Sequence, residues 1–466
     1  MNSERAPNGL LTRLRALVRP QTAATLAGAA ALEAVFEMLR RLGNLKLHVV
    51  ETIALALAAS VIYFIALYAL EHSGDARAAF WLILAGAVVF RVTLVPLVPT
   101  LSDDIQRYRW DGHVQQAGWN PYLVRPDDPR LAPLRDPGWS MMSGREVPTI
   151  YPPGAELVFR LTWRVLPGPV GFKLPFLLAD LLVVCMLAGW IRSTGGKNVQ
   201  LAIYAWNPLV VVEFAASGHN DAVAIAGLVA AIVIIRRHGT MSTLLLTAAA
   251  LAKAFPAALL PLWLRRAGWS KALWAAALTG ACVWPYRSVW SDFAHHRRPP
   301  IFDTFAYYQS QNYYPSLYTV IAWFSGSAEL AAGVGMGVVA GLAIWVAARP
   351  DPLGAQPLAG GDAARAAYIL VGTILMLAPN SCSWYFTWIV PLLCFFPLRG
   401  FSTAWLLLTV LQFLSYHVLI DYQATGRWHF DPFFQWLTYA PFYALLLGQM
   451  LRRGWRRRLD AALAAE

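Results

Sequence analysis

Charged residues are scarce in this sequence. Asp, Glu, Lys and Arg make up 14% of the 466 residues, whereas 58% of the residues are hydrophobic. A soluble enzyme of this length would fold into domains whose surfaces need far more charge. The hydrophobic residues instead form runs, separated by short polar breaks, along nearly the whole chain. We therefore predict an all-α polytopic membrane protein whose helices are solvated by lipid.

Cysteine is also rare, and no two cysteines form a CxxC pair. This pattern excludes a disulfide framework and the common zinc motifs, and it is typical of small packing residues. Short-period repeats, low-complexity tracts and an appended soluble domain are missing as well. We expect one transmembrane domain, 1–466, to carry the function. The cysteines are Cys185, Cys282, Cys382 and Cys394.

The net charge of +12 does not come from a basic domain that could bind nucleic acid. The positive charges lie at the chain ends and in short loops, where the positive-inside rule relates them to membrane topology. We predict that both termini are cytoplasmic and that nucleic acid is not a partner. The basic residues before the first apolar run and after the last one are Arg5, Arg13, Arg15, Arg19, Arg452, Arg453, Arg456, Arg457 and Arg458.

Hydropathy predicts about twelve crossings, some of them shorter than the roughly 20 residues that a perpendicular helix needs. Segment 242–264 is apolar but is interrupted by Lys253 and Pro256, so we predict two short helices that enter and leave on one side. The predicted spans are 19–38, 50–70, 79–98, 172–191, 199–217, 221–235, 271–286, 327–348, 366–379, 384–398, 401–420 and 433–450.

This topology brings the chemically richest loops to the extracytoplasmic side. The cytoplasmic loops contain little beyond Arg, Lys, Gly and Ser. The first large outer loop, 99–171, is expected to contain short interfacial helices, including an amphipathic one at 155–166. We therefore place the active face on the extracytoplasmic side of the membrane. The other outer segments are 218–221, 287–315, 380–385 and 421–432.

The first outer loop opens with a dense block of acids, arginines and aromatics. At helical spacing Asp104, Tyr108 and Asp111 share one face, and Asp103 and Arg107 share an adjacent one. A carboxylate held by an arginine at a membrane surface can act as a general base toward a sugar hydroxyl. The alternative is structural: Asp103 or Asp104 would cap the helix and pair with Arg107.

Two further outer turns contain candidate site residues. Tyr151 precedes two prolines and could line the site or merely belong to a turn into the membrane. His219, Asn220 and Asp221 could grip a phosphate or a divalent ion, although Asn220 or Asp221 would also suit an ordinary helix N-cap. Three adjacent residues make a poor metal cage. We predict no metal site and no cofactor.

The second large outer loop, 287–315, is rich in cations, amides and tyrosines. Arg287 could hold a lipid phosphate as it leaves, and Gln309 and Asn312 could bind sugar hydroxyls. The alternative is that the cations of this loop are attracted to anionic lipid headgroups and that its tyrosines belong to an aromatic belt. Trp384 and Tyr385 could equally belong to such a belt or to the wall of a lipid groove.

Three ionisable residues lie within the apolar segments and need partners there. We predict that Asp180 pairs with Arg91 or with Lys253. A central path of such residues would instead indicate a lipid transporter or flippase, which is the competing hypothesis.

The motifs, taken in order, resemble a known family. DDIQRYRWDG, GWNPY, TIYPP, WNPLVVVEFAASGHNDA, AKAFP and NSCSWYFTWIVP are together similar to the GT-C superfamily of integral-membrane glycosyltransferases. The closest similarity is to bacterial polyprenyl-phosphate-mannose-dependent mannosyltransferases. The motifs cover about 101–391, and the chain differs from some members in having no sizeable C-terminal soluble domain.

The resemblance implies a polyprenyl-phosphate sugar as donor and an inverting transfer with an acidic base in the first outer loop. That acid falls on Asp104, with Asp103 the close alternative. The GHND turn maps to His219, Asn220 and Asp221, and Lys253 matches a family lysine whose role spacing does not assign.

These inferences together predict a glycosyltransferase of the bacterial inner membrane. It would move a hexose, with mannose favoured by the resemblance, to a hydroxyl of a glycan or glycolipid acceptor at the extracytoplasmic face. Membrane lipids would surround it. Asp104 would take the proton from the acceptor, while Arg287 and His219 would stabilise the departing phosphate.

Overall fold

The computed structural model describes residues 20–73, 76–294, 304, 307, 313–349, 360–426 and 428–463. Within these ranges every regular element is a helix. Six helices are long and apolar enough to cross a membrane, and a bent pair would make a seventh span. The chain is thus an all-helical integral membrane protein. The predicted count of about twelve crossings is not confirmed, since several predicted spans, such as Asp221–Ile234 (α11) and Ala272–Val283 (α14), fold as helices of 14 and 12 residues.

Most helices begin and end close to the predicted boundaries. The long apolar ones are Pro20–Leu42 (α2), Val49–His72 (α3), Arg77–Leu94 (α4), Gly171–Thr194 (α8 with its first turn), Ala328–Ala348 (α18) and Phe401–Thr425 (which includes α21 and α22). The others in the bundle are Asn198–Ala205 (α9), Pro208–Val211 (α10), Asp221–Ile234 (α11), Gly239–Ala252 (α12), Leu260–Ala267 (α13), Ala272–Val283 (α14), Leu317–Ser325 (α17), Gly360–Leu377 (α19), Val390–Leu393 (α20) and Pro432–Leu463 (α23).

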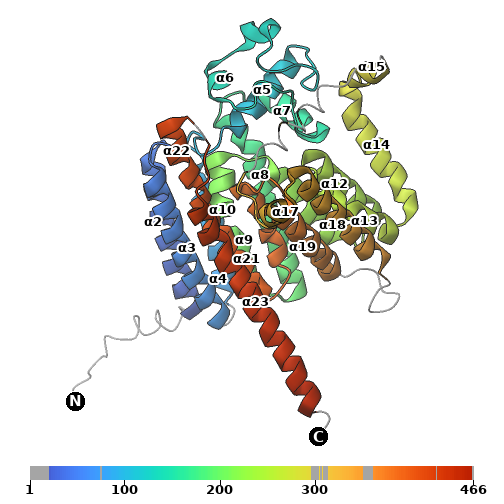
Figure 1. The fold of residues 1–466 in the computed structure, drawn as a ribbon. Coiled ribbons are helices and arrows are strands. Elements are labelled where there is room, and N and C mark those ends of the chain that lie inside the picture. The colour runs from blue at the N-terminus through green and yellow to red at the C-terminus, as the bar shows by residue number, and fades with distance from the viewer. Residues whose placement is uncertain are drawn as a thin grey trace, which may run out of the picture.

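The first large loop folds into a cap of short helices at one end of the bundle (Figure 1). The cap contains Asp104–Gln116 (α5), Pro137–Met141 (α6) and Pro153–Val165 (α7). The start of α2 and the end of α23 lie at the opposite end of the bundle. Short helices are present at the start of the block and over Pro153–Val165, and their position in the membrane interface stays a prediction.

Helices α12 and α13 form a hairpin of two short helices, and its entry and exit on one side of the membrane stays a prediction. Gly239 begins α12 and lies beside Ala267, where α13 ends. Trp263 Nε1 also donates a hydrogen bond of 2.8 Å to Ser242 Oγ. The two outer ends of the hairpin therefore lie side by side, and Lys253 lies at the break where α12 ends.

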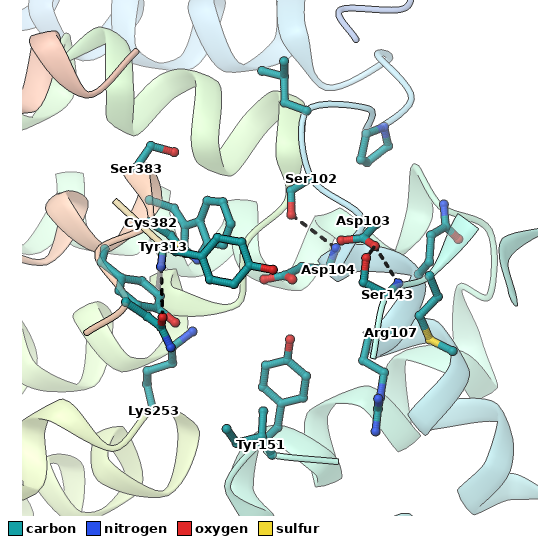
Figure 2. A pocket seen from close by; sticks show the side chains of 18 of the residues that line it. Ser102, Asp103, Asp104, Arg107, Ser143, Tyr151, Lys253, Tyr313, Cys382 and Ser383 are labelled. Carbon is teal, nitrogen blue, oxygen red and sulfur yellow. Dashed lines mark hydrogen bonds between the residues drawn. The ribbon is translucent and has the colours of Figure 1, made fainter. Parts of the chain in front are cut away.

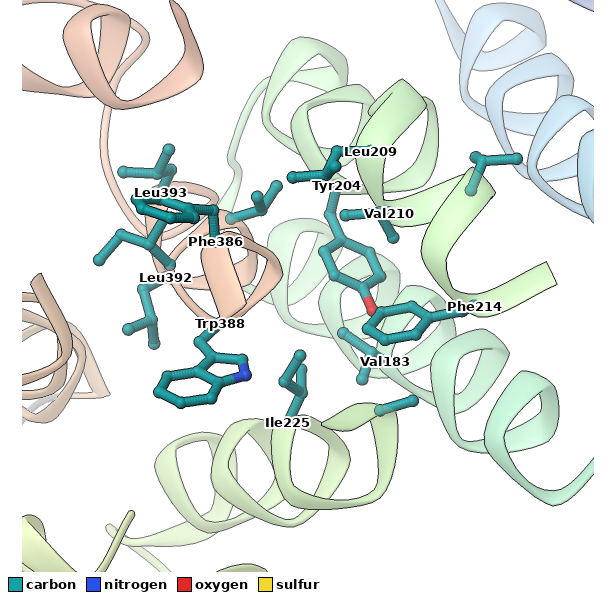
Figure 3. Close-up of a cluster of buried hydrophobic side chains, with 14 of the residues drawn as sticks. Val183, Tyr204, Leu209, Val210, Phe214, Ile225, Phe386, Trp388, Leu392 and Leu393 are labelled. Carbon is teal, nitrogen blue, oxygen red and sulfur yellow. The ribbon is translucent and has the colours of Figure 1, made fainter. Parts of the chain in front are cut away.

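A cluster of buried hydrophobic side chains joins several short helices, among them α9, α10 and α20 (Figure 3). The cluster is fully buried and brings together side chains from different helices. It includes Tyr204, Leu209, Phe214, Ile225 and Phe386. The break between α9 and α10 is satisfied locally, because the Asn207 side chain accepts hydrogen bonds from the first backbone N–H groups of α10. Backbone breaks at this depth are tolerated only when protein covers them, as it does here.

A buried ion pair joins α4 to α8. Arg91 Nε and Asp180 Oδ2 are 2.5 Å apart, and both side chains are inaccessible. Arg91 also donates to the carbonyl oxygens of Ala87 and Ala205, while Tyr204 donates to Asp180 Oδ1 at 2.8 Å. The predicted pairing of Asp180 with Arg91 is confirmed. These charges neutralise each other within the core, as a structural pair would.

We expect Asp180→Asn to destabilise the fold strongly. The substitution leaves Arg91 charged and without its carboxylate, and removing one partner of a buried pair costs about 3–5 kcal/mol. Thermal unfolding in detergent measures the effect. Asp421→Asn, at an exposed pair with His429, is the control and should change Tm little. Equal Tm values for the two variants would contradict the structural role.

Candidate active site

A cavity of about 1190 Å³ lies between the cap and the bundle. Its wall combines α5, the loop before α7, the break at the end of α12 and segment 380–388, which are distant in the sequence (Figure 2). The predicted site residues on this wall, together with the lysine at the break, are Asp103, Asp104, Arg107, Tyr151, Trp384, Tyr385 and Lys253. The cavity therefore unites motifs that the sequence could only place on one side of the membrane.

The two adjacent aspartates have different surroundings. Asp103 Oδ2 accepts hydrogen bonds from Ser143 N at 2.6 Å and from Ser143 Oγ at 2.5 Å, and so it holds the cap loop. The Asp104 carboxylate accepts one weak bond, from Tyr108 at 3.3 Å, and its side chain is 26% exposed. Figure 2 shows Asp104, Tyr151 and Lys253 around the same open space. Of the two aspartates on the wall, Asp104 thus has the weaker hydrogen bonds.

The environment of Asp104 suits a base. Burial raises the pKa of its carboxyl, the charges of His219 and Lys253 lower it, and Asp103 and Asp221 raise it again, so that the pKa lies above the usual value for aspartate. A raised pKa strengthens a carboxylate as a proton acceptor. A carboxyl group accepts a proton only when it is ionised, so this capacity is lost as the pH falls through its pKa.

Arg107 and Asp111 form an ion pair within α5. Their side chains are 3.0 Å apart and nearly inaccessible. Arg107 also donates to the carbonyl oxygens of Gly144 and Val147 in the cap loop. The alternative in which Arg107 pairs with a capping aspartate is wrong: its carboxylate partner is Asp111, and the Asp103 side chain makes no cap hydrogen bond. Asp111 and Tyr108 lie behind the wall and support it.

The GHND turn also lies behind the wall instead of on it. Asn220 Oδ1 accepts a hydrogen bond from Tyr108 at 3.2 Å, and Asp221 accepts from Trp388 Nε1 at 2.6 Å and from Lys253 Nζ at 3.1 Å. His219 is fully buried. The expected direct contacts of these three residues with substrate are therefore corrected to contacts with wall residues, and Asn220 makes no side-chain N-cap bond.

Comparison with known proteins bears on this arrangement. The family model described as "Alpha-(1->6)-mannopyranosyltransferase, N-terminal domain" matches residues 16–267, which is more than half of the chain. The chain belongs to this mannosyltransferase family. No curated protein and no solved structure matches it. The matched region contains α5, the GHND turn and Lys253, so the family assignment covers the cap side of the cavity.

The remaining predicted residues of this mannosyltransferase lie elsewhere or outside the described ranges. Arg287 is exposed, and its guanidinium lies 4.8 Å from the Trp284 ring centre, off the cavity wall. Arg287 follows the end of α14 at the edge of the bundle, and this placement removes it from the set of wall cations. Gln309 and Asn312 lie outside the described residues.

Sequence reasoning missed the position of Lys253 in the site. Its ammonium is 5.0 Å from the centre of the Tyr385 ring and pairs with Asp221, whereas Asp180 was one of its proposed partners. The sequence did contain a signal for this position, because a lysine followed closely by a proline in an apolar run indicates a break in the helix. The role of Glu213, which precedes the GHND turn and lies 3.1 Å from His219, was also missed. Among the described residues, no group of three or more His, Cys, Asp or Glu side chains could hold a metal ion.

We expect Gly218→Ala to destabilise this mannosyltransferase. Gly218 has φ +74°, and an added Cβ would lie 2.4 Å from Lys173 Cγ. Left-handed backbone and the clash together should cost about 1–3 kcal/mol. Gly280→Ala is the matched control, because its Cβ would meet nothing within 4 Å. Thermal unfolding of both variants in detergent tests this, and equal stabilities would show that the turn can relax.

Proposed function

We propose that the protein transfers mannose from a polyprenyl-phosphate donor to a hydroxyl of a glycan or glycolipid, with inversion. The observation that carries the proposal is Asp104, a free carboxylate with a raised pKa on a cavity large enough for two substrates. The family description names an α-(1→6) linkage, and we propose the same linkage here. The Asp103 carboxylate acts as a support of the cap loop.

The donor phosphate is placed beside Lys253. Lys253 lies on the wall near Asp104, whereas the wall cation Arg107 already pairs with Asp111, and an ammonium stabilises negative charge on a leaving phosphate. The wall next to Lys253 becomes apolar and suits a prenyl chain. Its apolar residues there are Phe255, Ala258, Val283, Val339 and Ile374. In this proposal Lys253 has the role of stabilising the departing phosphate, which the sequence suggested for Arg287 and His219.

The reaction then proceeds in one displacement. The acceptor oxygen attacks the anomeric carbon from the face opposite the phosphate while Asp104 takes the hydroxyl proton. The bond between the anomeric carbon and the phosphate oxygen breaks, and its electron pair stays on that oxygen. Phosphate needs no protonation to leave, so one carboxylate suffices, and we propose no cofactor.

The topology forms part of the same proposal. We place the cap and its cavity on the extracytoplasmic side of a bacterial inner membrane, with about twelve crossings in total. The whole chain, 1–466, acts as one domain, because the cavity takes Asp104 and Lys253 from the matched half and Trp384 and Tyr385 from the other half.

The direct test uses the purified protein in lipid nanodiscs. It is given polyprenyl-phosphate mannose labelled in the sugar, or labelled GDP-mannose, with an α-mannoside acceptor. We expect labelled product only from the lipid donor, with the anomeric configuration inverted relative to the donor. Transfer from GDP-mannose but not from the lipid donor, or lipid movement across liposomes without any transfer, would refute the proposal.

A further inference from the structure

A histidine and a glutamate lie buried directly behind Asp104. His219 and Glu213 are both fully inaccessible, and neither lines the cavity. His219 Nδ1 is 3.1 Å from Glu213 Oε2, and His219 Nε2 is 4.0 Å from Asp104 Oδ2. The imidazole therefore stands between two carboxylates, one of which is the proposed base.

Glu213 is held in a fixed orientation. Its Oε1 accepts hydrogen bonds from Tyr416 at 2.7 Å and from Ser383 at 2.9 Å. It lies in a π-helical turn, Val212–Ser217, and such turns occur often at functional sites. Lys173 donates to the carbonyl oxygens of Ala215 and Ala216 in this turn. The unusual backbone is thus stabilised, and the other Glu213 oxygen is left for His219.

His219 is fixed as firmly. Its ring stacks on Trp384, with centroids 4.2 Å apart and planes at 13°. Its backbone N–H donates to the Glu213 carbonyl oxygen at 3.1 Å. Among the described residues, neither ring nitrogen has a well-formed hydrogen bond. The 4.0 Å from Nε2 to Asp104 is too long for a direct hydrogen bond, so the two groups interact through charge or through one bridging water.

The surroundings of His219 are strongly acidic. Burial lowers the pKa of His219, but Glu213, Asp104 and Asp221 raise it, and the pKa lies above its usual value. Two lysines lie nearby: Lys253, which already pairs with Asp221, and Lys173, which donates to the carbonyl oxygens of Ala215 and Ala216. The titratable groups around His219 and Asp104, from all the elements that pack there, are Asp103, Tyr108, Lys173, Glu213, Asp221, Lys253, Cys382, Tyr385 and Tyr416.

We propose that Glu213 and His219 are positioning residues for the base: Glu213 keeps His219 in the imidazolium form, and its charge keeps Asp104 ionised beside the cavity. The inference rests on the proposed function, in which Asp104 must be ionised to accept a proton. Burial and the neighbouring acids oppose that ionisation. A fixed cation 4.0 Å away favours it.

The experiment measures kcat/KM for mannosyl transfer as a function of pH in His219→Gln and Glu213→Gln. Removing the imidazolium should move the acidic limb of the profile upward by about one to three pH units. Glu213→Gln should move it in the same direction by less, because His219 then loses its proton at a lower pH. The KM for the donor should change little in both. His72→Gln and Glu329→Gln, at exposed positions, are the matched controls.

The outcomes distinguish the positioning role of Glu213 and His219 from the proposed mannosyl transfer itself. An acidic limb identical to wild type in folded His219→Gln, or a higher donor KM with an unmoved limb, overturns the positioning role, and the second result would return His219 to the phosphate. If His219→Gln does not fold, the near-isosteric Glu213→Gln decides by the same criterion. A wild-type protein that transfers no mannose at any pH refutes the proposed function itself.

Discussion

Asp104→Asn is expected to lower kcat by about 10²–10⁴-fold, the usual contribution of a general base. The substitution keeps the shape of the side chain and its weak contact with Tyr108, but it removes the proton acceptor. Donor binding should persist, since Lys253 and the apolar wall are unchanged. The measurements are transfer from labelled polyprenyl-phosphate mannose and, separately, binding of the donor to the purified variant.

Asp103→Asn is the control at the neighbouring position. It weakens the two hydrogen bonds from Ser143 and should reduce activity much less. If Asp103→Asn alone abolished transfer while Asp104→Asn remained active, the assignment of the base would be wrong. The wild-type pH profile adds a second check. Because the pKa of Asp104 is raised, kcat/KM should begin to fall at a pH above the ordinary aspartate range of about 3.9.

Local sequence patterns predicted much of this architecture. Apolar runs located the helices because lipid requires continuous hydrophobic segments. Lys253 and Pro256 predicted the break between α12 and α13, since charge and proline both disfavour an unbroken apolar helix. The spacing within α5 placed Asp104 and Tyr108 on one face, where they are in contact.

Contacts between distant segments could not be predicted in the same way. Asp221 lies 32 residues from Lys253, and Glu213 lies 170 residues from Ser383. Hydropathy gives no information on which buried polar groups meet, so the sequence offered Asp180 as a partner for Lys253 and offered His219 as a phosphate ligand. Arg287 was favoured for its charge alone, although its guanidinium lies against the Trp284 ring and off the cavity wall. Several positions that chemistry singled out line the cavity, whereas their partners depended on the packing of the helices.

Lys253→Ala is expected to lower kcat/KM for the lipid donor by about 10²–10³-fold, the loss typical of one group that stabilises developing negative charge. The effect should appear mainly in kcat, because charge on the phosphate oxygen grows as the anomeric bond breaks. Lys197→Ala is the matched control, since that lysine is exposed and pairs with Glu71 away from the cavity.

The substitution at Lys253 also removes the partner of buried Asp221, so a structural defect must be separated from the loss of charge at the phosphate. The double variant Lys253→Met, Asp221→Asn does this, because it leaves no unpaired carboxylate while the cation is still missing. If the double variant recovers Tm but not activity, Lys253 acts on the donor. If it recovers activity as well, Lys253 serves only to neutralise Asp221, and the phosphate must be held by another part of the cavity.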